Sequence, residues 1–567
     1  MSNTAKHPKG LYFLFFTEMW ERFGYYLMLG IFSLYMLDSA ANGGMGFSPA
    51  QKSDVYGTYI GLVYLTPFLG GLLADRILGY RKSILIGGLM MAAGYIGLAL
   101  PGITMFYVSL LLIIVGNGFF KPNISTLVGN LYNNDQYRMN KDAGFNIFYM
   151  GINVGAFICN FVAAFMRINY GWGYAFAAAG VGMLIGLVIF FSGTKHIKDA
   201  DVIKPLHEGD LSTGKILATV LLPMFIFGVL GYLIPGNIFG TDTNDAFLFG
   251  CLPVISFFIY LFVKANKDDK GPIGALLAVY ACIVIFWAVF HQNGDALTVW
   301  AEEYTNREMP ASVGTAADKV GMAQIVVHSD AVDFEEARFK TYIDSLVVQK
   351  DSLSKIKDMV GVKKVAETIA LEEHSRKYFA NLPVSQIPPN GQNLKLFSAE
   401  LYQSINPFWV VLLTPIVVGF WGLLRNKKRE PSTPTKIAIG LVITALSALV
   451  MVAAVKTTDI GADKASSFWL IATYGVITVG ELCLSPMGLS LVSKLSPPRI
   501  TALMMGGFFL STSVGNKLSG VMSGLWEKYD DKSNFFLTNF FLVMFAAVVM
   551  FILLRWLNRV MREKNLF

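Results

Sequence analysis

Long runs of apolar residues dominate the chain and predict helices that cross a membrane. A run of about 18 or more apolar residues can span the hydrocarbon core of a bilayer as a helix. Fourteen runs near or above this length occur in the 567 residues, and we expect an all-α polytopic membrane protein. The runs lie at about 11–37, 53–74, 83–100, 104–130, 143–166, 174–193, 214–234, 246–264, 272–296, 403–424, 436–455, 468–492, 500–525 and 535–557.

One long polar stretch, residues 301–402, interrupts this series and is called the insert below. It holds 12 Lys and Arg and 15 Asp and Glu. Within 331–379 the apolar residues recur near helical spacing, which predicts two or three amphipathic helices. Two interpretations stay open. The insert is either a small exposed cap without a role in transport, or a docking surface for a partner or another subunit.

Composition agrees with a membrane protein and excludes a disordered chain, a secreted disulfide scaffold and a soluble multidomain enzyme. Hydrophobic residues make up 54% of the chain and charged residues 15%, whereas soluble domains are about a quarter charged. The four cysteines all lie in apolar runs without Cys-x-x-Cys spacing, so we expect neither disulfides nor a cysteine metal site. The first apolar run carries three charged residues, which makes it a poor signal-peptide core.

The distribution of basic residues predicts the orientation. If the N-terminus is cytoplasmic, 25 Lys and Arg fall in inside segments and six in the short outside loops. This asymmetry follows the positive-inside rule and places both termini in the cytoplasm. The net charge of +7 is therefore assigned to topology and not to a nucleic-acid partner.

Fourteen spans divide as six, two and six. We expect an N-terminal six-helix bundle in 1–193 and a linker with two extra helices in 194–270. The first helix of the C-terminal bundle then occupies 271–300, the extracytoplasmic insert 301–402, and the rest of that bundle 403–567. The extra pair has no ionisable residue in its interior, so it is expected to face lipid. The flanking sixes suggest two similar halves with a site between them.

The first predicted span carries an ionisable cluster. Glu18, Glu21 and Arg22 are spaced so that they share a helix face, and Tyr25 and Tyr26 follow one turn later. Charges inside a membrane are costly and usually functional, so this face is expected to line a cavity. The alternative is a structural ion-pair cluster that holds the helix to its neighbours.

The fourth span carries Lys121, with Asn117 one turn before it and Ser125 one turn after. Its expected partner is a carboxylate of the first span. Together with Arg22 it would form a cationic spot for a carboxylate group. The alternative is a pair that only packs helices.

The seventh span places Trp287, His291 and Asp295 at helical spacing. Histidine changes charge in the physiological pH range, which suits proton exchange. We expect His291 and Asp295 to share one face, unless Asp295 lies near the outer mouth.

The second half carries a lone carboxylate, Glu481, with Ser485 one turn on. Opposite a cationic cluster it would make the cavity bipolar, which suits a zwitterion with separated charges. The alternative is a carboxylate satisfied by neighbouring helices. Lys517 is expected to extend its side chain to the outer surface and is not counted as a site residue.

The loop between the second and third spans contains Gly71, Asp75, Arg76, Gly79 and Arg81. The glycines permit a tight turn, and Asp75 can form charge-assisted bonds with the arginines. The loop is either a cytoplasmic turn that follows the charge bias or a switchable latch between bundles.

No motif of an enzyme or a pump is present in the sequence. It has no P-loop, no His-Glu-x-x-His and no Gly-x-Ser-x-Gly. We therefore expect no enzyme activity, no metal and no cofactor. The driving force would be an ion gradient, and the buried carboxylates and His291 favour protons as the coupling ion.

Several of these motifs together carry a family resemblance. Gly71 to Lys82 resembles the loop signature of the major facilitator superfamily. Five further segments, in order, resemble motifs of its proton-coupled oligopeptide transporter (POT/PTR) family, bacterial type. They are Glu18-x-x-Glu21-Arg22-Phe23-x-Tyr25-Tyr26, Phe119 to Ser125, Phe145 to Asn153, Asn406-Pro407 and Gly480 to Gly488.

The resemblance implies a major facilitator fold and symport of di- and tripeptides with protons by alternating access. By it, Glu18, Glu21, Arg22 and Lys121 form the proton-coupled network on the substrate-carboxylate side. Glu481 would hold the peptide's amino terminus, and Trp287 would line a side-chain pocket. The residues implied to bond the peptide backbone and termini are Tyr25, Tyr26, Tyr64, Asn153 and Asn406.

Two residues depart from the family pattern. The family usually has an acidic residue at the position of His291, which affects the proton path on the seventh span. It often has Trp at the position of Phe508, and the missing indole N–H would alter side-chain preference.

The sequence thus predicts a proton-driven importer of di- and tripeptides in a bacterial plasma (inner) membrane. Its partners would be peptides, protons and the lipid bilayer, without nucleic acid, and any partner of the insert is unassigned. One alternative is a proton symporter of the same fold for nitrate or another small metabolite. The other is a non-transporting receptor on a transporter scaffold, with the insert as its binding module.

Overall fold

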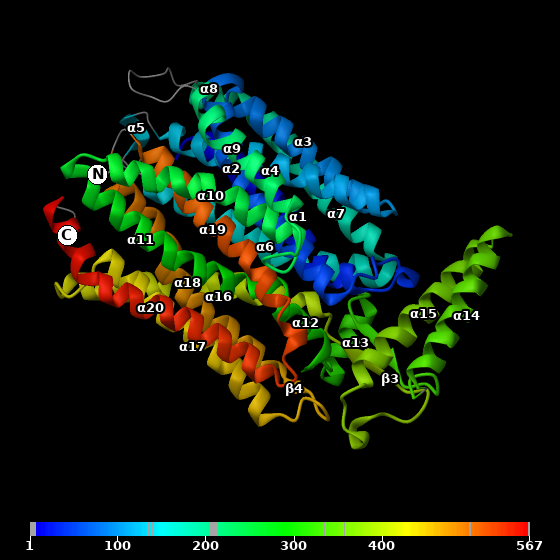
Figure 1. Ribbon diagram of the computed structural model, residues 1–567. Helices are drawn as coiled ribbons and strands as arrows, with labels where there is room; N and C mark the ends of the chain where they lie inside the picture. The colour runs from blue at the N-terminus through cyan, green and yellow to red at the C-terminus, as the bar shows by residue number, and fades with distance from the viewer. Residues whose placement is uncertain are drawn as a thin grey trace, which may run out of the picture.

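Long helices run side by side through most of the molecule, and the insert forms a separate lobe at one end (Figure 1). The computed structural model describes residues 7–132, 135–138, 141–202, 213–333, 335–356, 358–497 and 500–564. The N- and C-termini lie together at the end opposite the insert (Figure 1).

The first half of the chain forms a bundle around its own apolar core. Helix α2 begins with a capping box, in which Ser48 and Gln51 satisfy each other's backbone N–H groups. Gly171, with φ of +94°, forms the tight turn between the last two helices. The helices are α1 (Lys9–Leu37), α2 (Pro49–Leu73), α3 (Tyr80–Leu98), α4 (Ile103–Leu131), α6 (Lys141–Tyr170) and α7 (Trp172–Ile197), with the short α5 (Asp135–Arg138) between α4 and α6.

Two further helical segments lie outside the bundles. The first combines α8 (Thr213–Ile216), a π-helical turn at Leu217–Leu221 and α9 (Leu222–Leu233), and the second is α10 (Asp242–Lys264). They pack mainly on each other and expose apolar side chains such as Phe225 and Val263. This exposure agrees with the expected lipid-facing position.

The second half of the chain forms the other bundle, which has its own apolar core. Its helices are α11 (Lys267–Phe290), α16 (Ile405–Asn426), α17 (Thr433–Thr457), α18 (Ser467–Leu495), α19 (Thr501–Ser523) and α20 (Lys532–Glu563).

Each of the fourteen apolar runs is helical in the structure. Within the described residues, nine helices are long and apolar enough to cross a membrane by length and composition alone. Helix α1 is not among these nine, and it carries Glu18, Glu21 and Arg22 in its middle. The figure of fourteen spans therefore stays a prediction.

The insert is a small mixed lobe reached through a short helix, α12 (Ala296–Glu303). Strand β1 (Thr305–Asn306) pairs in parallel with β4 (Ala465–Ser466), which precedes α18, and β2 (Gln324–Val327) pairs antiparallel with β3 (Asn393–Leu396). The helices of the insert are α13 (Ala311–Lys319), α14 (Glu336–Lys355), α15 (Met359–Phe379) and the 3₁₀ turns Val384–Gln386 and Ala399–Ser404. Helices α14 and α15 form a projecting hairpin in the stretch where amphipathic helices are predicted (Figure 1).

The two halves meet closely where α2 packs against α19. A Cβ atom on Gly57 would lie 2.8 Å from the Cα of Gly520, and one on Gly520 would lie 2.4 Å from the carbonyl oxygen of Ser53. Only glycine fits this crossing at the insert end of the molecule.

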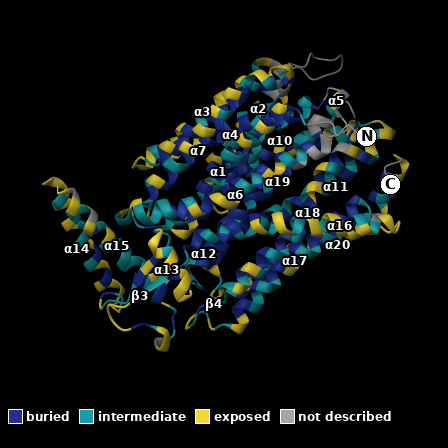
Figure 2. Ribbon diagram, turned by 180° about the vertical axis from the view of Figure 1, so that it is seen from behind, coloured by how far each residue is buried: buried dark blue, intermediate teal, exposed yellow. Residues whose placement is uncertain are grey.

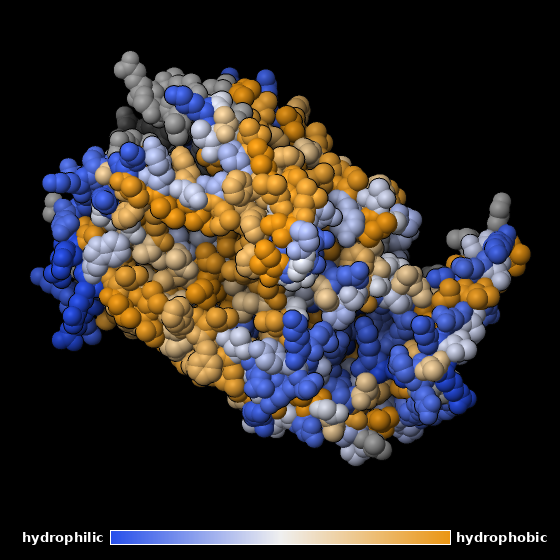
Figure 3. All heavy atoms as spheres, in the orientation of Figure 1, coloured by the Kyte–Doolittle hydropathy of each residue, from blue (hydrophilic) through white to orange (hydrophobic). Residues whose placement is uncertain are grey.

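The surface divides into an apolar belt and two polar ends. Exposed residues alternate with buried ones along the outer helices (Figure 2), and many of the exposed ones are large apolar side chains such as Phe191 and Ile552. Figure 3 shows apolar residues over the sides of the bundle and hydrophilic residues at the insert and at the opposite end. This is the surface expected of a protein surrounded by lipid.

Candidate functional site

A buried charge network lies in the middle of α1. The guanidinium of Arg22 forms a two-pronged ion pair with Glu21, and its Nε atom lies 3.5 Å from Oε1 of Glu18. Its Nη2 atom donates to Oδ1 of Asn117 on α4 at 3.2 Å. All three α1 side chains are buried. The second oxygen of Glu18, Oε2, is buried without a hydrogen-bond partner among the described residues.

Lys121 of α4 is placed differently from the sequence-based expectation. The expected carboxylate partner on α1 is wrong, because Arg22 takes Glu21 and approaches Glu18. Within the described part of the chain, Lys121 forms no ion pair, and its ammonium lies 4.0 Å from the ring centroid of Tyr64 on α2. Its charge acts electrostatically on Glu18 and on His291. Lys121 is thus a cation held by an aromatic ring between the two halves.

Aromatic residues follow the charge network along α1. Tyr25 and Tyr26 have ring centroids 5.2 Å apart, and the Arg22 guanidinium lies 4.8 Å from the centroid of Tyr25. Tyr25 is buried, whereas Tyr26 is half-buried. On α6, Asn153 is also buried and donates to the carbonyl of Tyr149 at 3.1 Å.

His291 lies at the end of α11 and faces the first half of the chain. Its ring centroid is 5.2 Å from that of Trp287 and 6.0 Å from that of Tyr64. Its Nδ1 atom is 3.3 Å from the carbonyl oxygen of Trp287. Tyr64 therefore contacts both Lys121 and His291, which are two of the five residues predicted to take part in proton coupling.

Of the two placements expected for Asp295, the face shared with His291 is wrong, and Asp295 lies toward the end of the molecule that carries the insert. Helix α11 ends at Phe290, and a 3₁₀ turn over His291–Gly294 separates it from α12, so Asp295 does not continue the face of His291. Asp295 instead forms an ion pair with Lys52 of α2, and Ser33 donates to the neighbouring carbonyl of Gly294 at 2.9 Å. The Asn293-Gly294 dipeptide is a turn signal that could have located this break.

The second half contributes the carboxylate of Glu481 on α18. Asn406 of α16 donates to Oε2 of Glu481 at 3.2 Å and to the hydroxyl of Thr478 at 2.8 Å. Glu481 interacts electrostatically with Tyr26 and Tyr149, which belong to the first half. The carboxylate thus faces the bundle that holds the two cations.

Two other predicted residues are Ser485, on the same helix as Glu481, and Phe508, on the neighbouring helix α19. The hydroxyl of Ser485 is buried without a hydrogen-bond partner among the described residues. Phe508 of α19 is buried, and a Cβ atom on Gly488 would lie 2.6 Å from its ring, so the ring fills the space at that glycine. Ser485 is free to accept or donate a new hydrogen bond, whereas Phe508 is packed between helices.

The loop after α2 is fixed within the first half. Gly79, with φ of +78°, follows a π-helical turn, and Arg81 donates to Asp201 at 2.7 Å. The N–H of Tyr80 also donates to Asp201, at 2.7 Å. Asp201 follows α7, so the arginine's observed partner is in the same half, and sequence reasoning missed it. Gly71 lies against Pro122 of α4, while the side chains of Asp75 and Arg76 lie outside the described residues.

The prediction that Lys517 extends to the surface is wrong. Its side chain is fully buried, and its ammonium lies 3.0 Å from Oδ1 of Asp54 and 3.2 Å from the hydroxyl of Thr243. Asp54 lies near the start of α2 and Thr243 in the first turn of α10, so this pair ties α19 to both. The carboxylate is far away in sequence, which is why local spacing gives no signal for the pair.

Comparison with known proteins gives a consistent picture. The chain matches the model of the POT family over residues 81–320 and 393–553, which passes over most of the insert. It is 30% identical over 537 residues to the uncharacterized transporter YclF of Bacillus subtilis (strain 168), covering 93% of this chain and 90% of that one. It is 28% identical over 556 residues to the di-/tripeptide transporter of Lactococcus lactis subsp. lactis (strain IL1403), covering 96% and 95%. The crystal structure of peptide transporter POT in complex with sulfate superposes with a TM-score of 0.73 at 27% identity, over 98% of this chain and 96% of that one.

Proposed function

The chain belongs to the POT family, and from that premise we propose that it is a proton-coupled symporter that imports di- and tripeptides. It is a multi-pass membrane protein of the major facilitator fold. We place it in the plasma (inner) membrane with both termini in the cytoplasm, because the basic residues gather at the end where the termini lie. The coupling ion is the proton, and no cofactor or metal takes part.

The observation that supports peptides is the bipolar arrangement of the site. Arg22 and Lys121 stand on the first half, and Glu481 faces them from the second half. A peptide zwitterion carries a carboxylate at one end and an ammonium at the other, so it matches both sides at once. The unpaired hydroxyl of Ser485 and the amide of Asn406 would add polar contacts, as would Tyr25, Tyr26, Tyr64 and Asn153. Trp287 would face the peptide's side chains, and Phe508, packed against Gly488, would limit the space behind them.

The charge network on α1 supports proton coupling. Glu18, Glu21, Arg22, Lys121 and His291 form one continuous electrostatic cluster. When a proton binds a carboxylate of this cluster, its pairing with Arg22 weakens. In the cycle we propose, a proton and a peptide enter from the outside, the loosened pairs allow the halves to rock, and both are released inward. In this cycle the loop with Gly71, Asp75, Arg76, Gly79 and Arg81 steadies the cytoplasmic end of the first half.

Uptake of labelled dialanine into proteoliposomes with an imposed inward proton gradient tests the proposal. We expect accumulation that depends on the gradient and collapses when a protonophore is added. Equilibration without accumulation would remove proton coupling, and absence of any dialanine uptake would remove the peptide assignment. Nitrate and a free amino acid, assayed in parallel, test the alternative of another small cargo.

A variant of Glu481 tests the assigned contact with the peptide's amino terminus. A hydrogen bond to a charged group contributes about 1.5–3 kcal/mol, so Glu481→Gln should raise the half-saturating dialanine concentration at least about tenfold. N-acetylated dialanine has no ammonium, so its competition should hardly change. Glu336→Gln, on the exposed face of the insert, is the matched control and should leave both values unchanged. Equal effects on both peptides would remove Glu481 from this role.

A further inference from the structure

The insert is attached firmly to the second half of the chain. Its first strand, β1, pairs in parallel with β4, and Thr305 lies opposite Ala465. The ammonium of Lys464 donates to the carbonyl of Glu303 at 2.7 Å and to the side chain of Asn381 at 2.5 Å. A shared apolar cluster of α12, α17 and α18 residues supports the same junction. Backbone pairing, a buried lysine and apolar packing therefore anchor the insert to this half.

The insert also reaches across to the first half. Its 3₁₀ turn carries Glu400, which forms a two-pronged ion pair with Arg167 at the end of α6, at 2.7 and 3.0 Å. The side chain of Asn160, two turns earlier on α6, donates at 3.1 Å to Ser404, which ends the same 3₁₀ turn just beyond the insert. Asn169 donates to the carbonyl of Gly321 in the insert at 2.5 Å.

The projecting hairpin makes a second set of crossing contacts with the turn that follows α1. Glu373 of α15 accepts hydrogen bonds from Ser39 at 2.7 Å and from Asn42 at 2.6 Å. Lys350 of α14 donates to the carbonyl of Ala41 at 2.9 Å, and the side chain of Ala41 packs on the apolar core of the hairpin. These contacts are made to a single turn, Ala40–Asn42, and they are mainly polar.

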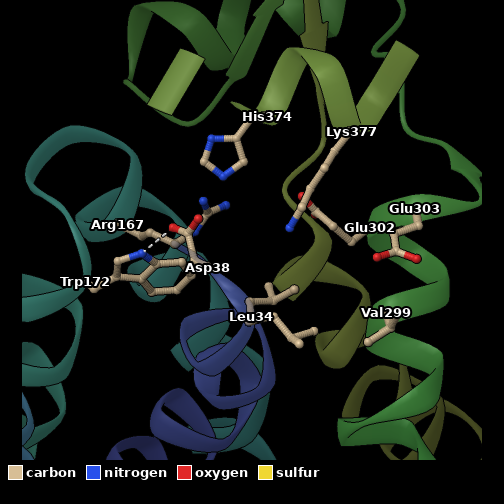
Figure 4. Close-up of a pocket in the computed structure, with 10 residues that line it drawn as sticks. Leu34, Asp38, Arg167, Trp172, Val299, Glu302, Glu303, His374 and Lys377 are labelled. Carbon is tan, nitrogen blue, oxygen red and sulfur yellow. Dashed lines mark hydrogen bonds between the residues drawn. The ribbon is translucent and has the colours of Figure 1, made fainter. Parts of the chain in front are cut away.

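The seam between the insert and the first half is hollow and charged. Figure 4 shows His374 and Lys377 of α15 on one side and Asp38, Arg167 and Trp172 on the other, with Trp172 donating to Asp38. The cavity between them has a volume of about 20 Å³, which is enough for about one water molecule. Polar surfaces that already enclose such a space can separate by exchanging their partners for water.

We propose that the insert is an intramolecular strap that holds the two halves together at the end opposite the termini. The proposal rests on alternating access in the proposed function, because it assigns the insert to one state of that cycle. The insert travels with the second half, to which the β1–β4 pair and Lys464 fix it. It releases the first half when that end opens, and it re-forms the contacts of Glu373, Lys350 and Glu400 when that end closes.

The asymmetry of the two attachments carries this assignment. The contacts to the second half include backbone pairing and an apolar cluster, which do not separate without unfolding. The contacts to the first half are mostly side-chain bonds to the turn after α1 and to α6, which can break as a unit. A cap without a role in transport would not need hydrogen bonds and an ion pair to the first half. The family's sequence model passes over residues 321–392, so the strap is an addition to the shared machinery.

Distance measurement between spin labels tests the strap without relying on transport. Tyr174→Cys on α7 and Phe468→Cys on α18 place labels on the two halves near the insert, and the native side chains are 62% and 64% exposed. The native cysteines among the described residues are all buried, which limits background labelling. In the full chain in lipid nanodiscs, Glu373→Ala removes two hydrogen bonds to a charged carboxylate and should raise the ratio of the long to the short distance at least about tenfold.

A neighbouring carboxylate supplies the matched control. Glu372 accepts from Ser329 at 2.5 Å, and that bond lies entirely within the insert. Glu372→Ala should therefore leave the distance distribution unchanged. An unchanged distribution in Glu373→Ala, or the same change in both variants, would overturn the strap.

Cross-linking tests the same contact by holding it closed, whereas Glu373→Ala breaks it. Ser39→Cys with Glu373→Cys, joined by a short reducible bifunctional reagent, should abolish dialanine uptake, and reduction should restore it. Ser329→Cys with Glu372→Cys, joined in the same way, should leave uptake intact. Full uptake with the Ser39–Glu373 link closed would overturn the strap while leaving peptide transport standing, whereas absent uptake before linking would count against the proposed function itself.

Discussion

Lys52 and Asp295 form an ion pair that joins the two halves of the chain. Both side chains are buried, with 5% and 0% exposed, at the end of the molecule that carries the insert. Lys52 lies in the first turn of α2, and Asp295 is the residue between the 3₁₀ turn that follows α11 and helix α12. The pair therefore bridges the interface that must open if substrate is to enter from that end.

Variants of this pair should show whether stability and uptake need the ion pair itself or a positive charge on α2 and a negative charge at position 295. Loss of one partner from a buried pair costs about 3–5 kcal/mol, so Lys52→Met and Asp295→Asn should each lower the Tm and reduce uptake. The exchanged double variant, Lys52→Asp with Asp295→Lys, should recover part of both. Thermal unfolding in detergent and dialanine uptake are the measurements. A double variant no better than the single ones would mean that the pair does not act as a unit.

Glu21 should separate coupling from binding. Glu21→Gln keeps the shape and one oxygen acceptor for Arg22 but cannot carry a proton. We expect uptake driven by a proton gradient to disappear, while exchange of peptide across the membrane without a gradient persists. Glu430→Gln, which removes a carboxylate paired with Lys436 at the other end of the molecule, is the control. Retained accumulation in Glu21→Gln would remove Glu21 from coupling.

His291 should set the pH range of transport. A carboxyl group becomes neutral when it binds a proton, whereas an imidazole becomes positively charged, so the two groups respond differently to pH in the same buried position. His291→Asp should therefore preserve transport and shift its pH optimum. The comparison variant is His328→Gln, a histidine of the insert, whose profile should match that of the native chain. An unchanged optimum in His291→Asp would make His291 a structural residue.

The glycine crossing of α2 and α19 should tolerate no side chain. Overpacking of a tight contact costs about 1–3 kcal/mol, so Gly57→Val should lower the Tm and wedge the halves apart. Gly419→Val on α16 is the control, because a Cβ atom there meets nothing within 4 Å. The effect is measured by uptake and by the distance between spin labels attached through Tyr174→Cys and Phe468→Cys. If Gly57→Val and Gly419→Val gave the same Tm, uptake and label distances, the close contact of α2 with α19 would not be needed for the closed state.

The seam of the insert should weaken in acid. Burial lowers the pKa of His374, and the nearby charges of Arg167 and Lys377 lower it further, while Asp38 and Glu302 act in the opposite direction. Docking thus favours the neutral imidazole, whereas a freed histidine regains a pKa of about 6.5. The undocked state binds the proton more readily, so docking should be constant at higher pH and weaken below about pH 6.5.

The label pair on α7 and α18 measures this response between about pH 8 and about pH 5. The long distance should gain population in acid in the native chain. In His374→Gln the population should stay constant. A pH response of the same size in that variant would assign it to other groups.

The sequence predicts the helices well because each is encoded locally. Every apolar run is helical, although the run at 272–296 breaks after Phe290, and the cluster on α1 follows from the spacing of Glu18, Glu21 and Arg22 along one turn. The placement of Lys121 and the break after Phe290 were predicted less well. Arg22 competes for the carboxylates expected to pair with Lys121, and that outcome depends on side-chain reach in three dimensions.

The pairs that join distant segments could not be predicted from local pattern. Lys52 with Asp295, Lys517 with Asp54 and Arg81 with Asp201 are each separated by more than a hundred residues. Periodicity within one helix carries no information about which distant helix end will face it. In a membrane protein such pairs are decided by burial, because a charge away from water must find a partner wherever the fold brings one.

The hydrophilic end that holds the termini has a consequence for the choice of lipid. Basic residues such as Lys267, Lys428 and Arg559 gather at that end, which Figure 3 shows as the strongly hydrophilic pole opposite the insert. Each such residue near a membrane surface attracts anionic headgroups with about 1 kcal/mol. Phosphatidylglycerol in the vesicles should therefore seat and orient the protein, whereas purely zwitterionic vesicles should yield a mixture of insertion directions and an apparently lower activity.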